Sequence, residues 1–191
     1  PVRSLTVPAP MPIRYPSPPL TDGAIVLRPW VAGDLEALVA ICDDPDVARF
    51  TPLPAPYTAA DGRAWLGADL GRMQAGEELS LAIHDRGGGP VGSIGARVDA
   101  DDRDVVELGY LVARAARGRG IATAAVRLLA GWMLREWRPA RMQLTTNVDN
   151  PASQRVAERA GFQREGVLRA WADNRGRRVD LVMYSRLPGD P

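Results

Sequence analysis

A glycine-rich stretch, Arg117-Gly118-Arg119-Gly120-Ile121-Ala122, joins an apolar segment (residues 107–112) to a strongly amphipathic one. A turn of this kind between a strand and a helix leaves backbone N–H groups without partners and adds the positive end of the helix dipole. Both features favour an anion, so the stretch predicts a phosphate site. A plain tight turn with solvated arginines fits the same residues.

Two common phosphate motifs do not fit this stretch. All 24 basic residues are arginine, so the lysine of a P-loop is missing, and no lysine can act as a Schiff-base nucleophile or general base. A dinucleotide fingerprint needs a third glycine where Thr123 stands, and it normally follows the first strand of a parallel sheet. Here three strands that we expect to be antiparallel come first.

Three further side chains are candidates for proton transfer. Ser153 lies three residues after Asn150, the expected N-cap of a helix, so its hydroxyl can protonate a leaving group at the helix mouth or help to cap the helix. Glu107 is a candidate general base and equally an ordinary strand residue in a salt bridge. His84, the only histidine, is expected to be structural, with its hydrogen bonds satisfied.

A proline-rich segment, residues 43–57, is expected to be a loop. Its aspartates, Asp43, Asp44 and Asp46, can attract a cationic substrate or form a solvated acidic loop, which we favour. Four aromatic residues are candidates for the core or for a cleft wall: Phe50, Tyr57, Tyr110 and Trp171.

Composition limits the class of protein. The 191 residues, 46% of them hydrophobic, suffice for one domain with a single core. A net charge of +1 lacks the positive field of a nucleic-acid-binding protein. Cys42 is the only cysteine, so we expect no intrachain disulfide and no metal site. From its place on the apolar face of an expected helix, we expect Cys42 to be a core residue. No apolar run spans a bilayer and no signal-peptide pattern is present, so we expect a cytoplasmic protein with no membrane partner.

The hydrophobic periodicity predicts an α/β (α+β) domain. Seven strands are expected, at residues 24–28, 79–85, 91–98, 105–112, 142–147, 163–171 and 180–186. Helices are expected at residues 34–43, 58–74, from 121 onward and 151–160. The second, third and fourth strands form an antiparallel meander, and the helix from residue 121 makes the fourth and fifth strands parallel. Residues 1–20 hold seven prolines and form an extended tail, which leaves 21–191 as the domain.

This order of elements resembles the GNAT acyltransferases, specifically their RimJ/RimL-like branch, over about residues 22–187. The residues that carry the resemblance are Arg117, Gly120 and Ala122, in the family's Gln/Arg-x-x-Gly-x-Gly/Ala pattern, followed by Asn150-Pro151-Ala152-Ser153 and Ala160-Gly161-Phe162. The resemblance implies a mostly antiparallel sheet with helices on both faces, splayed between the fourth and fifth strands.

The resemblance also implies the cofactor, acetyl-CoA, and the residues that bind it. Its diphosphate is expected at Arg117, Gly118, Arg119, Gly120, Ile121, Ala122 and Thr123, with added charge from Arg114. Its pantetheine arm is expected along Leu108, Tyr110, Leu111 and Val112, and near Asn150 and Ser153. In the family a serine at this place protonates the sulfur of coenzyme A, which is the role implied for Ser153.

The resemblance further implies an N-acetyltransferase that forms a ternary complex, in which an amine attacks directly. The leading acceptor is a protein N-terminal α-amine. A small-molecule amine and a succinyl-CoA donor stay open, as does a CoA-binding sensor without turnover. Homodimers are common in the family, so a homodimer is a further expectation.

Overall fold

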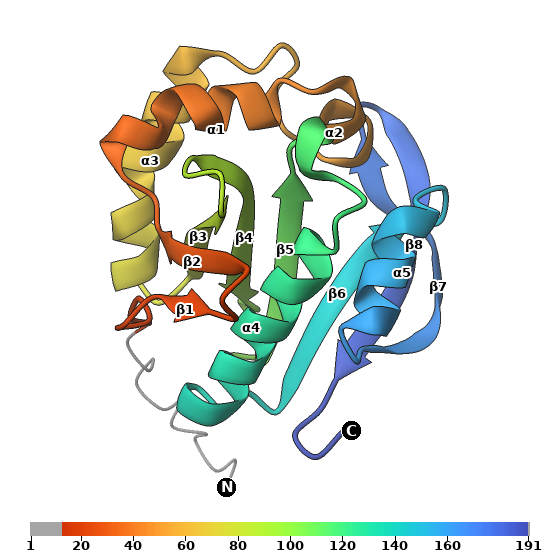
Figure 1. Ribbon diagram of the computed structural model, residues 1–191. Coiled ribbons are helices and arrows are strands. Elements are labelled where there is room, and N and C mark those ends of the chain that lie inside the picture. The colour runs from red at the N-terminus through yellow and green to blue at the C-terminus, as the bar shows by residue number, and fades with distance from the viewer. Residues whose placement is uncertain (1–12, 191) are drawn as a thin grey trace, which may run out of the picture.

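The computed structural model describes residues 13–190, and its centre is one sheet of eight strands in the order β1-β2-β3-β4-β5-β6-β8-β7 (Figure 1). Every neighbouring pair is antiparallel except β5 and β6, which are parallel. The strands are β1 Leu20–Thr21, β2 Ile25–Pro29, β3 Glu78–Asp85, β4 Pro90–Val98, β5 Val105–Val112, β6 Arg141–Asn147, β7 Gln163–Asn174 and β8 Arg177–Arg186. The predicted meander and the predicted parallel pair are confirmed, and β1 adds an eighth strand.

Helices cover both faces of this sheet (Figure 1). They are η1 Ala32–Asp34, α1 Leu35–Cys42, α2 Pro45–Phe50, α3 Ala59–Gln74, η2 Arg114–Ala116, α4 Ile121–Glu136 and α5 Pro151–Arg159. Strand β3 shows the division, because Leu81 and Ile83 pack in the core under α4, whereas Ala82 between them packs with Trp30 and Leu38 on the α1 side.

The parallel pair is short, and this opens the sheet. Strand β5 pairs with β6 only over Val105–Glu107, opposite Arg141–Gln143. Beyond this point β6 continues its pairing with β8 as far as Asn147, while β5 keeps only β4 as a partner. The sheet is therefore splayed between β5 and β6, which are the fourth and fifth of the strands expected from the sequence.

Local signals fix the helix ends that border this opening. Thr58 and Asp61 form a reciprocal capping box at the start of α3. Asn150 Oδ1 accepts a hydrogen bond from the Ser153 N–H at 3.1 Å at the start of α5. Gly161 has φ = 86° after α5, and the Phe162 N–H returns to the Ala157 carbonyl at 3.0 Å.

The expected loop at residues 43–57 is wrong in part, because it contains helix α2, Pro45–Phe50. Asp44 caps this helix by accepting the Asp46 N–H at 2.7 Å, and Pro45 occupies the first turn, where a missing N–H costs nothing. The same Asx-Pro pattern as Asn150-Pro151 therefore starts a helix here as well.

The described end of the N-terminal arm packs on the domain. Ile13 is buried in the main core, and the Tyr15 hydroxyl donates to Asp69 Oδ2 at 2.7 Å. The predicted tail over residues 1–12 lies outside the described residues. Within 13–190, none of the helices combines the length and the apolar character that crossing a membrane requires.

Candidate active site

The glycine turn leads from η2 into α4 with its backbone amides open to a groove. Gly118 has φ = 76° and Gly120, the N-cap of α4, has φ = 79°. These left-handed conformations suit glycine, and a Cβ at either position would meet no atom within 4 Å. No side chain caps α4, so the first amides of this 16-residue helix are free to bind an anion.

The arginines of this turn form ion pairs with distant aspartates. Arg117 donates to Asp46 Oδ2 at 2.7 Å, to Asp44 Oδ2 at 3.1 Å and to the Val112 carbonyl at 2.9 Å. Arg114 reaches the same two aspartates at 3.2 to 3.3 Å, and Arg119 pairs with Asp85 at 3.0 Å. The backbone therefore supplies most of the unbalanced positive potential at the turn.

The acidic loop that we expected at Asp43, Asp44 and Asp46 is not simply solvated, because all three side chains have structural partners. Asp44 is only 9% exposed, and both it and Asp46 hold α2 against the turn. Asp43 accepts the Tyr57 N–H at 3.0 Å and so ties the two ends of the segment together.

A groove of about 580 Å³ runs from the turn to α5. Most of the predicted cofactor residues line it: Tyr110, Leu111, Val112, Arg117, Gly118, Gly120, Ile121, Ala122, Thr123, Asn150 and Ser153. Leu108 and Arg119 do not line it: Leu108 borders a second cavity, and Arg119 turns toward Asp85. The groove's size and its open glycine cradle fit a ligand with a diphosphate and a long arm, as acetyl-CoA has.

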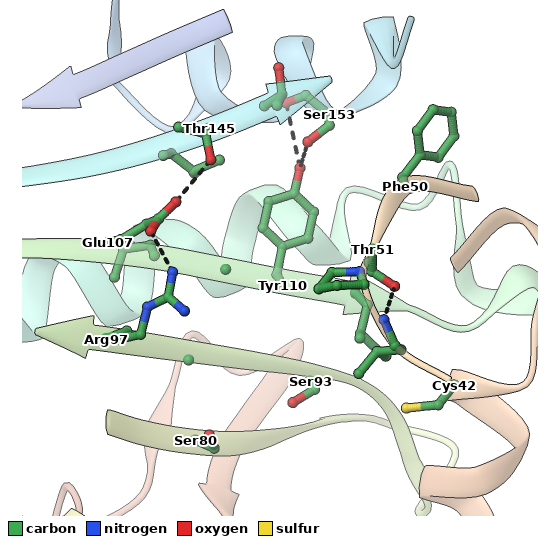
Figure 2. Close-up of a pocket in the computed structure, with 18 of the residues that line it drawn as sticks. Cys42, Phe50, Thr51, Ser80, Ser93, Arg97, Glu107, Tyr110, Thr145 and Ser153 are labelled. Carbon is green, nitrogen blue, oxygen red and sulfur yellow. Dashed lines mark hydrogen bonds and ion pairs between the residues drawn. The ribbon is translucent and has the colours of Figure 1, made fainter. Parts of the chain in front are cut away.

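Ser153 and Tyr110 meet at the inner end of this groove. Tyr110 Oη and Ser153 Oγ lie 2.8 Å apart, as Figure 2 shows. Burial raises the pKa of Tyr110 to about 12, although the hydrogen bond with Ser153 lowers it somewhat. The phenol is therefore neutral near pH 7 and can donate or accept the hydrogen bond that it shares with the serine hydroxyl.

A second cavity of about 460 Å³ lies on the other side of the gap. Its floor consists of side chains from β3, β4, β5 and β6, and its cover comes from α1, α3 and the segment between α2 and α3. Six residues line both cavities: Phe50, Thr51, Tyr110, Leu111, Asn150 and Ser153. The two cavities thus meet where β5 and β6 separate, at the Tyr110–Ser153 pair.

Glu107 lies on the floor of this second cavity. Its carboxylate accepts hydrogen bonds from Thr145 Oγ1 at 2.8 Å and from Arg97 at 2.8 Å (Figure 2). The hydrogen bond with Glu107 raises the pKa of the Arg97 guanidinium. Two donors leave lone pairs of the carboxylate free to accept a further hydrogen bond. The predicted salt bridge of Glu107 is therefore present, and its role as a general base stays a prediction.

The other side chains singled out from the sequence differ in whether they border a cavity. Phe50 and Tyr57 line the second cavity, whereas Trp171 is 58% exposed and borders none of the cavities described. His84 Nδ1 donates to the Gly88 carbonyl at 3.0 Å, which fits a structural role, but its buried Nε2 has no partner among residues 13–190. Cys42 borders the second cavity, yet burial raises the pKa of its thiol to about 11, so it is a poor nucleophile.

Sequence reasoning missed Arg97 and Thr145. Arg97 faces Glu107 directly in the β4–β5 register, so pairing the expected strands residue by residue would have found it. Thr145 comes from β6, across the gap, and no local pattern relates it to Glu107. Among residues 13–190, no cluster of three or more histidine, cysteine or carboxylate side chains forms a candidate metal site.

Comparison with known proteins identifies the family of this chain. Residues 24–163 match the family model described as "Acetyltransferase (GNAT) domain". A relative from Bacillus licheniformis, named "Uncharacterized N-acetyltransferase p20", is 25% identical over 166 residues, which cover 85% of this chain and 92% of the relative.

Two solved structures share the fold. A RimL ribosomal alpha-N-protein acetyltransferase in complex with coenzyme A has a TM-score of 0.80 and 20% identity, over 91% of this chain and 98% of that one. The microcin C7 self-immunity acetyltransferase MccE, in complex with acetyl-CoA and AMP, also has a TM-score of 0.80, with 22% identity over 87% of this chain and 93% of that one.

Proposed function

The chain belongs to the GNAT acetyltransferases, and from this premise we propose that it acetylates protein N-terminal α-amines by direct attack in a ternary complex. Family membership makes it an acyl-CoA-dependent N-acyltransferase with acetyl-CoA as its cofactor. The acceptor and the residue roles are the proposed part. The observation that carries them is the meeting of two cavities at the Tyr110–Ser153 hydrogen bond.

The groove between the glycine turn at the start of α4 and helix α5 is the proposed cofactor site. Acetyl-CoA supplies a thioester whose acetyl group is transferred to the amine. The amides after Gly118 and Gly120 bind the diphosphate, and the end of β5 (Tyr110, Leu111 and Val112), which lacks a partner on the β6 side, lines the path of the arm. Ser153 Oγ gives its proton to the departing thiolate and takes back, through water, the proton that the attacking amine loses, while Tyr110 Oη orients that hydroxyl from 2.8 Å away.

The second cavity is the proposed acceptor site, with Glu107 as the base, directly or through a water molecule. An α-amine has an ordinary pKa of about 7.7, so roughly a tenth or more is neutral near pH 7, whereas a lysine amine at about 10.4 is almost entirely charged. The Glu107 carboxylate already accepts hydrogen bonds from Arg97 and Thr145, and an α-amine, which is partly neutral near pH 7, makes a smaller demand on a base than a lysine amine does. The RimL neighbour is an alpha-N-protein acetyltransferase, which supports the same acceptor.

Direct attack is the proposed route, since the only cysteine is a poor covalent carrier. Cys42 is 5% exposed and its thiol is held neutral by burial. An acyl-enzyme formed on a cysteine requires the thiolate at neutral pH, which Cys42 does not supply.

A small-molecule amine is the second candidate acceptor, because the MccE neighbour was solved with acetyl-CoA and AMP. A succinyl-CoA donor would keep the same groove and change only the acyl group. A CoA sensor would bind the cofactor in that groove without turnover.

Thiol release from acetyl-CoA, and from succinyl-CoA in parallel, measured across peptides with free α-amines, the same peptides with blocked N-termini, and small amines, tests the proposal. We expect release with the free peptides and none with the blocked ones. Release only with small amines would overturn the acceptor, release only with succinyl-CoA would overturn the donor, and binding without any release would leave a sensor.

A further inference from the structure

A third cavity, of about 550 Å³, lies between α2, the end of β6 and the two-residue turn between β7 and β8. Figure 1 shows the β7–β8 hairpin reaching toward α2 beyond the open end of the sheet. Contacts hold this arrangement, because Arg175 of the turn donates to the carbonyls of Ala48 and Leu53 at 3.2 and 2.9 Å. The cavity is therefore a built feature of the fold, and it borders the cofactor groove at Phe50 and Asp149, which line both.

The charge of this cavity is strongly positive. Three arginines line it, Arg49, Arg175 and Arg177, against one carboxylate, Asp149. Within residues 13–190, none of the three arginines forms a salt bridge. This contrasts with Arg114, Arg117 and Arg119, which all have aspartate partners. Guanidinium groups bind carboxylates through paired hydrogen bonds, so the cavity suits an anionic group.

A further hydrogen bond ties the end of β7 to α2. Asn174 donates its Nδ2 to the Arg49 carbonyl at 2.7 Å. Its Oδ1 is shielded from solvent and has no partner in the described chain, so it does not face a ligand in the cavity. The contacts for a ligand therefore come from the guanidinium groups, which the acidic side chains of a peptide match.

The cavity adjoins the proposed acceptor site. Phe50 and Asn147 line both cavities, one from α2 and the other from the end of β6. An acceptor whose amine lies between Glu107 and Ser153 can therefore continue past these two residues toward the arginines. Because the two cavities share lining residues, the arginines lie beside the path of the residues that directly follow the N-terminus of the acceptor.

We propose that this arginine-lined cavity is a specificity subsite for acidic residues directly after the N-terminus of the acceptor. The inference rests on the proposed function, because it assumes that a peptide amine is the acceptor. It names the class of substrate within that function: proteins whose first few residues carry negative charge.

Two peptides that differ only in charge provide the test, one with glutamates at the second and third positions and one with glutamines there. Initial rates with acetyl-CoA give kcat and KM for each peptide with the full-length enzyme. We expect the acidic peptide to have a KM about tenfold lower, with similar kcat, and the preference to weaken as salt rises.

Three variants localise the effect. Arg177→Gln removes an arginine that makes no side-chain hydrogen bond or ion pair within residues 13–190, so the fold loses nothing; we expect KM for the acidic peptide to rise about threefold. Arg49→Gln/Arg177→Gln should abolish the preference and leave the KM of the glutamine peptide unchanged. Arg63→Gln on α3, also exposed and without an ion pair there, is the matched control and should keep the preference.

The outcomes are distinguishable. Turnover of both peptides with equal KM overturns this inference and leaves the proposed function intact. No turnover of any peptide overturns both. Efficient acetylation of 2-aminoethyl phosphate instead, lost in the double variant, places the anion on a small molecule and overturns the peptide assignment.

Discussion

The two sides of the β5–β6 gap are built in different ways. The cofactor groove depends on backbone amides from one continuous stretch, with positive φ angles at Gly118 and Gly120 and a helix without a side-chain cap. The acceptor cavity depends on side chains from four strands and from α1, α2 and α3. A binding site formed by backbone amides tolerates substitution of its side chains. A binding site formed by side chains changes its specificity with each substitution. The donor side therefore depends on the fold itself, and the acceptor side is where substrates are selected.

Gly120→Val tests the backbone side of this comparison and should have the largest effect of the variants considered. A β-branched residue at φ = 79° is strained, and its side chain would project into the open space over the helix amides. We expect acetyl-CoA affinity to fall at least about hundredfold in calorimetric titration. Gly23→Val is the matched control, because Gly23 has φ = 85° and equally open surroundings but lies in the β1–β2 turn. Equal loss in both variants, or none in Gly120→Val, would refute the backbone site.

Ser153→Ala tests the Tyr110–Ser153 pair, where the cofactor groove and the acceptor cavity meet. The variant keeps the amide that Asn150 caps but removes the hydroxyl 2.8 Å from Tyr110. We expect kcat to fall about a hundredfold, with the affinity for acetyl-CoA nearly unchanged. Steady-state rates and a titration measure the two quantities separately. Unchanged turnover would remove Ser153 from the mechanism and leave it as a capping residue.

Asp46→Asn tests how much the arginine side chains contribute to cofactor binding. Asp46 holds Arg117 at 2.7 Å and Arg114 at 3.2 Å, so it competes with a diphosphate for both guanidinium groups. Because these groups are partly exposed, we expect only about threefold tighter acetyl-CoA binding in the same titration. Weaker binding would mean that Asp46 positions the arginines and does not compete for them.

Glu165→Gln should affect stability and neither cavity. Hydrogen bonds from Arg141 and Ser185 lower the pKa of Glu165 to about 2. A lowered pKa contributes stability above the unfolded value near 4.5, and this contribution disappears as pH falls from there toward 2. The carboxylate is 42% exposed, so we expect a loss of about 1 kcal/mol at pH 7.

Urea unfolding of wild type and Glu165→Gln at pH 7 and pH 3 measures this difference, which should shrink at the lower pH. Glu77→Gln, at an exposed site without an ion pair in the described chain, is the control. A difference that grows on acidification would reverse the sign of the linkage.

The same contrast explains what the sequence could predict. The glycine turn, the caps at Thr58 and Asn150 and the β5–α4–β6 unit depend on neighbours in the chain, and the structure has them where the residues indicate. Helix α2 was missed because four prolines around it suggested a loop, although Asp44-Pro45 has the same form as Asn150-Pro151.

Long-range partners escaped prediction for a physical reason. Arg117 and Asp46 are 71 residues apart, and Glu107 and Thr145 are 38 apart. Only the folded sheet brings them together, and no periodicity records which charges will pair. Trp171 shows the reverse case, since its aromatic ring made it a candidate for the core or for a cleft wall, but the strand places it on the surface.

A crystal structure of the enzyme with coenzyme A would show directly whether the gap between β5 and β6 joins donor to acceptor. We expect the diphosphate on the amides that follow Gly118 and Gly120, and the sulfur within about 3.5 Å of Ser153 Oγ, facing that gap. A diphosphate held away from this turn, or a sulfur directed away from Ser153, would contradict the proposed site.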